Sequence, residues 1–82
     1  MKDLTVPVQN IEGIGSPLAV RFVQKANEFP CHITISHKAR TINAKSLLGV
    51  LSLEIRHQDE VTLTAEGDQE AQAVSELAII LK

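Results

Sequence analysis

The sequence predicts a small α+β domain of two layers, in which three helices cover one face of a four-stranded, mostly antiparallel sheet. Stretches that alternate apolar and polar residues are interleaved with stretches of helical apolar spacing, in the order βαββαβα. The chain has 82 residues, of which 44% are hydrophobic, enough for one small core. No repeat, linker or low-complexity segment interrupts the pattern, so residues 1–82 are expected to form a single domain.

The first third of the chain predicts a strand followed by a helix. Residues 4–8 alternate apolar and polar side chains, which predicts a strand. Pro7 has no N–H to donate, so it is expected on an edge strand or at a strand end. Ser16 is expected to cap the first helix, with Pro17 at its first helical position. The helix is expected to end near residues 27 and 28, because Pro30 follows them. The apolar face of this helix is expected to comprise Leu18, Ala19, Phe22, Val23, Ala26 and Phe29.

The remaining strands and the last helix follow from the same two patterns. Residues 31–36 and 40–43 alternate and are expected to form a hairpin around a turn at residues 37–39. Residues 60–65 predict the fourth strand, and Asp68 is expected to cap the last helix. The buried face of that helix is predicted to contain Ala71, Val74, Leu77, Ala78 and Leu81.

A short helix is predicted from Ser46 to about Ser52. Ser46 suits the N-cap because its hydroxyl can accept a hydrogen bond from an unpaired backbone N–H, and the same geometry suits a phosphate. For an arbitrary serine before an apolar run, capping alone is the default interpretation. The apolar residues of this helix surround it almost completely, so some of Leu47, Leu48 and Leu51 must remain near the surface.

Composition excludes several functional classes. A net charge of −2 and the absence of Trp and Tyr argue against direct nucleic-acid binding. The longest apolar run, residues 77–81, is too short for a membrane span, and the first residues do not resemble a signal peptide. The one cysteine, Cys31, excludes an internal disulfide. A soluble cytoplasmic domain is therefore expected.

Catalytic and metal-binding patterns are absent from the sequence. His32, His37 and His57 have no metal-ligand spacing and are expected to be exposed. Cys31 and His32 are strand neighbours that point to opposite faces, so they cannot act as a nucleophile and base. The loop before the first helix lacks the length and the lysine of a Walker motif. We therefore expect a binding module or carrier that needs no cofactor, rather than an enzyme.

Two stretches, together with the order of elements, resemble a known family. Gly13 and Ile14 precede the first helix, and residues 43–53 read NAKSLLGVLSL. Over essentially its whole length the chain resembles HPr, the small phosphocarrier of the bacterial sugar phosphotransferase system, which has an open-faced two-layer sandwich fold. The resemblance implies that HPr kinase/phosphorylase phosphorylates Ser46 and that the product is a corepressor of a catabolite control regulator.

The chain departs from the family at the phosphocarrier motif, Gly-Ile-His-Ala-Arg-Pro-Ala. Residues 13–19 read GIGSPLA, so Gly15 replaces the histidine that takes phosphate from enzyme I in the family, and Pro17 replaces the arginine beside it. Glycine has no nucleophilic nitrogen, which excludes phosphohistidine transfer at this position. Loss of the histidine with retention of the serine resembles the Crh branch of the family, although Crh proteins usually carry glutamine and arginine at these two positions.

The resemblance also implies a partner-binding surface on the first and second helices. Its residues would be Val20, Arg21, Gln24, Lys45, Leu47, Leu48 and Leu51. Lys45 is expected to help hold the phosphate. The alternative hypothesis is a divergent HPr-fold interaction module that is not phosphorylated. Both a monomer and a domain-swapped dimer, formed by exchange of the first strand, are compatible with the sequence.

Overall fold

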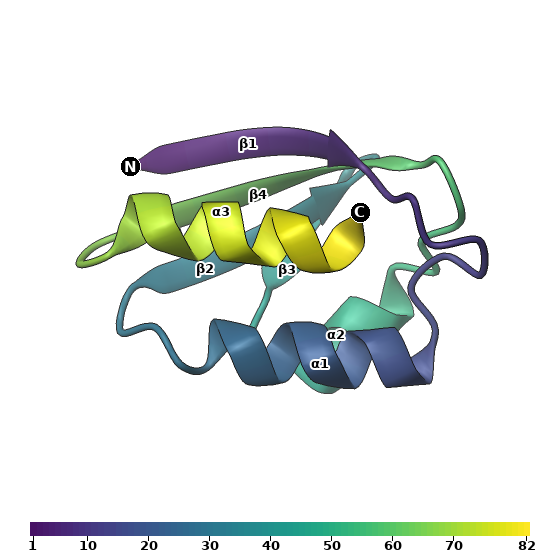
Figure 1. Ribbon diagram of the computed structural model, residues 1–82, viewed down its shortest axis with the longest axis horizontal. Helices are drawn as coiled ribbons and strands as arrows, with labels where there is room; N and C mark the ends of the chain where they lie inside the picture. The colour runs from purple at the N-terminus through teal and green to yellow at the C-terminus, as the bar shows by residue number, and fades with distance from the viewer.

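The computed structural model describes all residues from Met1 to Lys82 and has the predicted element order. The four strands pair antiparallel in the spatial order β1-β4-β2-β3, and all three helices lie on one face of the sheet (Figure 1). The predicted fold class is thus confirmed. The elements are β1 (Lys2–Pro7), α1 (Ser16–Ala26), β2 (His32–His37), β3 (Arg40–Asn43), α2 (Leu47–Ser52), β4 (Glu60–Glu66) and α3 (Glu70–Leu81).

A single apolar core of 23 buried residues fills the space between the layers. The predicted inner face of α1 is confirmed: Phe22 is fully buried at its centre, and Val23 packs against the core from the flank. On α3, Val74, Leu77, Ala78 and Leu81 are buried as predicted, but Ala73 is buried in place of the expected Ala71, which is exposed. Ala73 precedes Leu77 by one turn and therefore shares its face, whereas Ala71 does not. None of the helices is long and apolar enough to cross a bilayer.

Two predicted helix caps are wrong. Ser16 is the first helical residue of α1, because the Gly15 carbonyl already accepts the Ala19 N–H at 2.9 Å and makes Gly15 the N-cap. At α3 the N-cap is Gln69 in a left-handed conformation rather than Asp68. Neither cap residue supplies a side-chain hydrogen bond.

The observed strand ends also differ from the predicted ones by one or two residues. Strand β1 begins at Lys2 rather than residue 4 because its pairing with β4 continues beyond the alternating stretch, from Lys2 opposite Ala65 to Pro7 opposite Glu60. Pro7 ends an edge strand, as predicted. Strand β2 runs from His32 to His37 instead of from residue 31 to 36.

His37 is buried, contrary to the prediction of an exposed turn residue. It continues the inward face of Ile33 and Ile35, and its Nε2 forms a 3.0 Å hydrogen bond with Asp59 Oδ2. The same Asp59 oxygen accepts the backbone N–H of Arg56 at 3.0 Å. The Arg56 bond is the main reason that the pKa of Asp59 lies below its usual value, and the His37 bond lowers it further.

Candidate functional site

The turn between β3 and α2 presents Ser46 at the start of a helix. Asn43 shapes this turn: its Oδ1 accepts the Lys45 N–H at 2.9 Å, and its backbone carbonyl accepts the Ser46 N–H at 3.1 Å. Ser46 then adopts an extended conformation, and its Oγ accepts the Gly49 N–H at 3.2 Å. Ser46 is therefore the N-cap of α2, as predicted.

Gly49 leaves room for the Ser46 hydroxyl. A Cβ at residue 49 would lie 3.2 Å from Ser46 Oγ and 3.0 Å from the Ile42 side chain, both tighter than ordinary contacts. Ser46 itself is exposed to solvent, and the one bond of its hydroxyl is that to Gly49. No carboxylate or imidazole of the chain is bonded to this hydroxyl as a base.

The start of α2 is fastened to the end of α1 by two residues. Lys45 Nζ donates to the Phe29 carbonyl at 2.7 Å, and Asn27 Nδ2 donates to the Lys45 carbonyl at 3.3 Å and to the Val23 carbonyl at 2.8 Å. The Lys45 ammonium is thus bonded to the connection after α1 and not to Ser46. The sequence does not reveal this bond, because it joins residues 16 positions apart on different elements.

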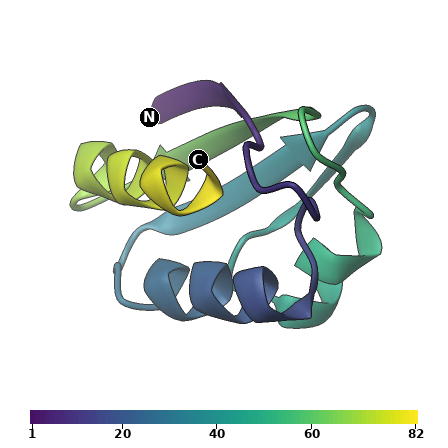
Figure 2. The same cartoon turned by 45° about the vertical axis from the view of Figure 1, so that its right-hand side comes forward.

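Exposed apolar residues gather where α1 and α2 lie side by side beneath the sheet (Figure 2). Leu48 has 81% of its surface exposed, Val20 38% and Leu47 37%, whereas Leu51 packs partly against the core. Val20 and Gln24 lie on the flank of α1 that faces α2, because they precede Asn27 by seven and three residues. We call Val20, Gln24, Leu47 and Leu48 the helix-pair face.

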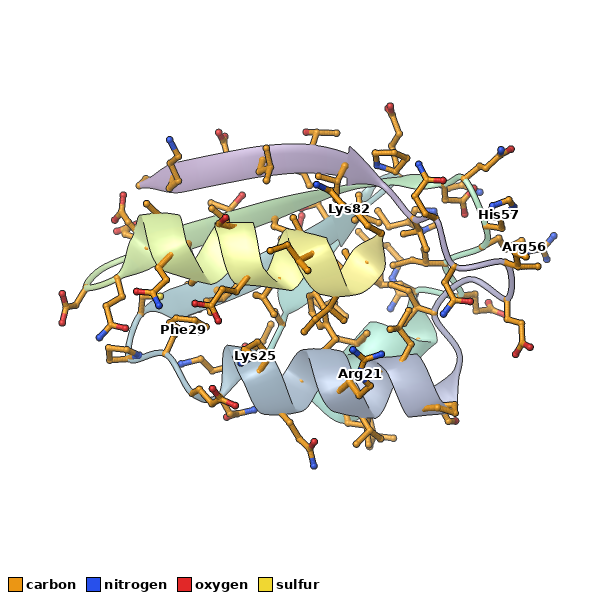
Figure 3. All side chains as sticks on the ribbon, in the orientation of Figure 1. Arg21, Lys25, Phe29, Arg56, His57 and Lys82 are labelled. Carbon is orange, nitrogen blue, oxygen red and sulfur yellow. The ribbon has the colours of Figure 1, made fainter.

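Arg21 lies on the opposite flank of α1. It precedes Lys25 by one turn, and Lys25 Nζ forms an ion pair with Glu76 of α3 at 3.6 Å (Figure 3). Lys25 is also paired with Glu28 at 3.3 Å. The structure therefore brings together Val20 and the α2 leucines and places Arg21 on the α3 side of α1, away from those leucines.

The start of α1 is built differently from that of α2. Gly13 has a φ of +68°, and a Cβ there would lie 2.3 Å from the Ile55 carbonyl oxygen and 2.8 Å from Arg56 Cα. The next residue, Ile14, donates its N–H to the same Ile55 carbonyl at 3.0 Å. Gly15 has ordinary extended backbone, and a Cβ there would meet nothing within 4 Å. Packing thus requires glycine at residue 13 and not at residue 15.

Comparison with known proteins identifies the family. A family model described as "PTS HPr component phosphorylation site" matches residues 2–82. The chain belongs to the HPr family. The HPr-like protein Crh of Bacillus subtilis is 37% identical to it over 73 residues, which are 89% of this chain and 86% of Crh.

Solved HPr-family structures match the fold. A crystal structure of the phosphocarrier protein HPr from Bacillus anthracis superposes with a TM-score of 0.96 at 34% identity, covering 99% of this chain and 96% of that one. A crystal structure of Bacillus subtilis Crh, described as an intertwined dimer with a swapped domain, gives a TM-score of 0.78 at 34% identity, covering 99% and 93%. The chain is therefore equally identical to this phosphocarrier and to this Crh protein. Overall identity does not tell which of the two it resembles more, and that distinction depends on individual residues.

The HPr-like chain anchors the end of α2 through a residue that the sequence did not single out. Arg40 donates from Nη1 to the Ser52 carbonyl at 2.7 Å and from Nη2 to Ser52 Oγ at 3.1 Å. Ser52 Oγ in turn donates to the Gly49 carbonyl at 2.6 Å. This arrangement satisfies backbone groups at the end of a helix of only six residues and helps to fix the leucines it carries. A lone arginine on an edge strand carries no sequence signal for this role.

The histidines and the cysteine form no reactive cluster. Cys31 is buried and His32 is exposed, so the two face opposite sides, as strand alternation predicts. His57 is exposed on the loop before β4 (Figure 3), far along the chain from both. No group of three or more His, Cys, Asp or Glu side chains has the arrangement of a metal site.

Proposed function

We propose that this HPr-like chain is a regulatory protein of carbon catabolite control rather than a histidine phosphocarrier. HPr kinase/phosphorylase phosphorylates Ser46, and the phosphorylated chain acts as corepressor partner of a catabolite control regulator. The observation that carries the proposal is the juxtaposition of an exposed, capping Ser46 with the exposed Leu48 on the same short helix. The family's acceptor position is meanwhile occupied by Gly15, which has no side chain to accept phosphate.

The switch is mainly electrostatic. A phosphate on Ser46 adds about 1.5 to 2 negative charges at the start of α2 without requiring the helix to move. The helix-pair face supplies apolar contact, and the new charge supplies a contact for a basic patch on the regulator. Lys45 reaches the phosphate only if its ammonium leaves the Phe29 carbonyl, so phosphorylation is expected to loosen that bond.

The proposed role requires neither catalysis nor a cofactor from this chain. The protein acts in the cytoplasm through protein partners, without direct contact to nucleic acid or membrane. Both a monomer and a dimer formed by exchange of β1 are compatible with this role. Support for exchange comes from the edge position of β1 and from the swapped dimer described for Bacillus subtilis Crh.

Intact-mass spectrometry after incubation with HPr kinase/phosphorylase and ATP tests the modification. We expect one added phosphoryl group, located on Ser46 by fragmentation. The matched control is Ser46→Asn, because asparagine caps a helix as well as serine does but offers no hydroxyl. Phosphate on neither protein, with the kinase active on an ordinary HPr, would refute the proposal.

A binding titration with a catabolite control regulator tests the apolar contact. Leu48→Ser in the phosphorylated chain is expected to weaken regulator binding by about tenfold or more, since a large exposed side chain at the contact is lost. Ile79→Ser is the control, because Ile79 is 62% exposed but lies on α3, away from the helix-pair face. Equal affinities of the two variants would show that the regulator does not bind through α2.

The second candidate function is an interaction module that acts without phosphorylation. Two observations favour it: the Lys45 ammonium is held by Phe29, and Arg21 lies away from the α2 leucines. In this case the unmodified chain would bind its partner through the helix-pair face, and Ser46→Asn would bind as well as the parent. The two functions therefore differ in whether binding depends on kinase treatment.

A further inference from the structure

A polar hollow of about 540 Å³ lies beside the end of α2, away from Ser46. It is formed by the β2–β3 hairpin turn, the end of α2 and the loop that leads to β4. The size falls in the range of small-molecule sites. The charged and polar side chains that line it are His37, Lys38, Arg40, Ser52, Glu54, Arg56 and Asp59.

The positive charges at this hollow are arranged in two ways. Arg40 is fixed, because two of its nitrogens donate to Ser52, and its remaining N–H groups stay available. Lys38 and Arg56 have side chains without an ion pair or hydrogen bond, and Arg56 extends from the loop at the end of the molecule opposite Phe29 (Figure 3). A fixed guanidinium with two cations around it suits a phosphate group, which arginine binds through two parallel hydrogen bonds.

The hollow also carries two carboxylates. Glu54 has no partner of its own, whereas Asp59 already accepts bonds from His37 and from the Arg56 backbone. A ligand that was only an anion would be repelled by Glu54. A ligand that also carries hydroxyl groups could donate to this carboxylate while its phosphate meets the cations.

Backbone strain is concentrated around the same hollow. Four residues other than glycine have positive φ; two of them line the hollow, Lys38 at 56° and Glu54 at 50°, and a third, Gln58 at 72°, lies next to the lining residue Asp59 in the chain. Side-chain-bearing residues adopt this conformation only at a cost, and such positions cluster at functional sites. Glycine would relieve the strain at residue 54, yet the chain has glutamate there, directed to the lining.

We propose that this hollow binds a small phosphate monoester that carries several hydroxyl groups, such as a sugar phosphate. Arg40, Arg56 and Lys38 bind the phosphate, and Glu54 accepts hydrogen bonds from the hydroxyls. Nucleotides are excluded as the preferred class, because Leu53 is the one apolar residue of the lining and its one ring, the His37 imidazole, is buried and bonded to Asp59, so no exposed ring face is offered to a base. The site does not involve Ser46 and is independent of the proposed function.

The test is an NMR titration of the isotope-labelled full chain with ribose phosphate, compared with inorganic phosphate, free ribose and adenosine monophosphate. We expect saturable amide shifts confined to residues 37–40 and 52–59, with ribose phosphate binding more tightly than phosphate or ribose alone. Adenosine monophosphate should bind no more tightly than ribose phosphate. Tighter binding of adenosine monophosphate, or shifts spread evenly over the surface, would overturn the assignment.

Two substitutions separate a built site from general charge attraction. Arg56→Gln is expected to weaken ribose phosphate binding about tenfold, the scale of one lost charge-assisted hydrogen bond. Arg21→Gln is the matched control, because it removes the same charge from an exposed position on α1 and should leave the affinity unchanged. Equal losses in both variants would show that net charge alone attracts the ligand and would contradict the proposal.

Discussion

The start of α1 is held by close backbone packing and presents no side chain at residue 15. The start of α2 is held by side-chain hydrogen bonds and presents a hydroxyl. At α1 the backbone is tightly held through Gly13, but residue 15 is open and carries no functional group. At α2 the turn is held by side chains of Asn43 and Asn27, and the residue that it presents, Ser46, has a hydroxyl in solvent. Both helix starts are thus held firmly, but residue 15 presents no side chain to solvent whereas residue 46 presents a hydroxyl.

This difference shows that a helix can begin correctly at a position that has no reactive side chain. Gly15 caps α1 through its carbonyl alone, so the helix begins correctly with no side chain at that position. Ser46 caps α2 through its side chain, so a replacement that cannot accept the Gly49 N–H changes both stability and chemistry.

The largest expected effect is a gain of chemistry at α1. Gly15→His should fold normally, because residue 15 has ordinary φ and ψ and open space, and it should accept phosphate from phosphorylated enzyme I where the parent accepts none. The measurement is the mass of the chain before and after acid treatment, since phosphohistidine is acid-labile. Gly15→Gln is the control. A folded Gly15→His chain that stays unmodified would show that Pro17, in place of arginine, prevents transfer.

The next effect concerns the backbone at the same helix start. Gly13→Ala should lower the free energy of unfolding by about 3 kcal/mol, since a Cβ at positive φ would overlap the backbone of residues 55 and 56. Gly15→Ala should change it by less than about 1 kcal/mol. Urea denaturation of both variants measures the contrast. Similar stabilities would contradict the close approach at Gly13.

A smaller effect is expected from the cap of α2. Ser46→Ala removes the hydrogen bond to the Gly49 N–H and should cost about 1 kcal/mol, whereas Ser46→Asn should retain most of the stability. Thermal unfolding of the unphosphorylated chains provides the measurement. If both variants lose the same stability, Ser46 contributes through something other than capping.

The smallest effect depends on pH and lies outside both helix starts. The pKa of Asp59 is lowered in the folded chain, chiefly by the Arg56 N–H, so its carboxylate stabilises the fold above the normal pKa of aspartate. This contribution disappears as the pH falls through the lowered folded value. Asp59→Asn should therefore be less stable than the parent at neutral pH, and the difference should shrink in acid. A difference that is independent of pH would exclude the charge as its cause.

Much of this architecture was predictable from the sequence. Alternation and helical spacing gave the element order, and the excess of apolar residues on a short helix predicted that some of Leu47, Leu48 and Leu51 stay near the surface, as Leu47 and Leu48 do. Local chemistry was also sufficient for the Ser46 cap. These features depend on residues close together in the chain, for which spacing is a direct guide.

Features that depend on distant residues could not be predicted. The bond from Lys45 to Phe29, the anchoring of Ser52 by Arg40 and the burial of His37 against Asp59 all join separate elements. Helix caps at Gly15 and Gln69 were missed for a different reason, because each uses the backbone alone and leaves no side-chain signature. To predict that Arg21 lies away from the leucines, one would need to know which side of α1 packs against α3.

The most direct test of the contrast between the two helix starts is intact-mass analysis of the native chain under two phosphate donors in parallel. One reaction contains HPr kinase/phosphorylase with ATP, and the other contains phosphorylated enzyme I. We predict a single acid-stable phosphoryl group on Ser46 in the first reaction and none in the second. Phosphate transfer in the second reaction, or its absence from the first with an active kinase, would contradict the account.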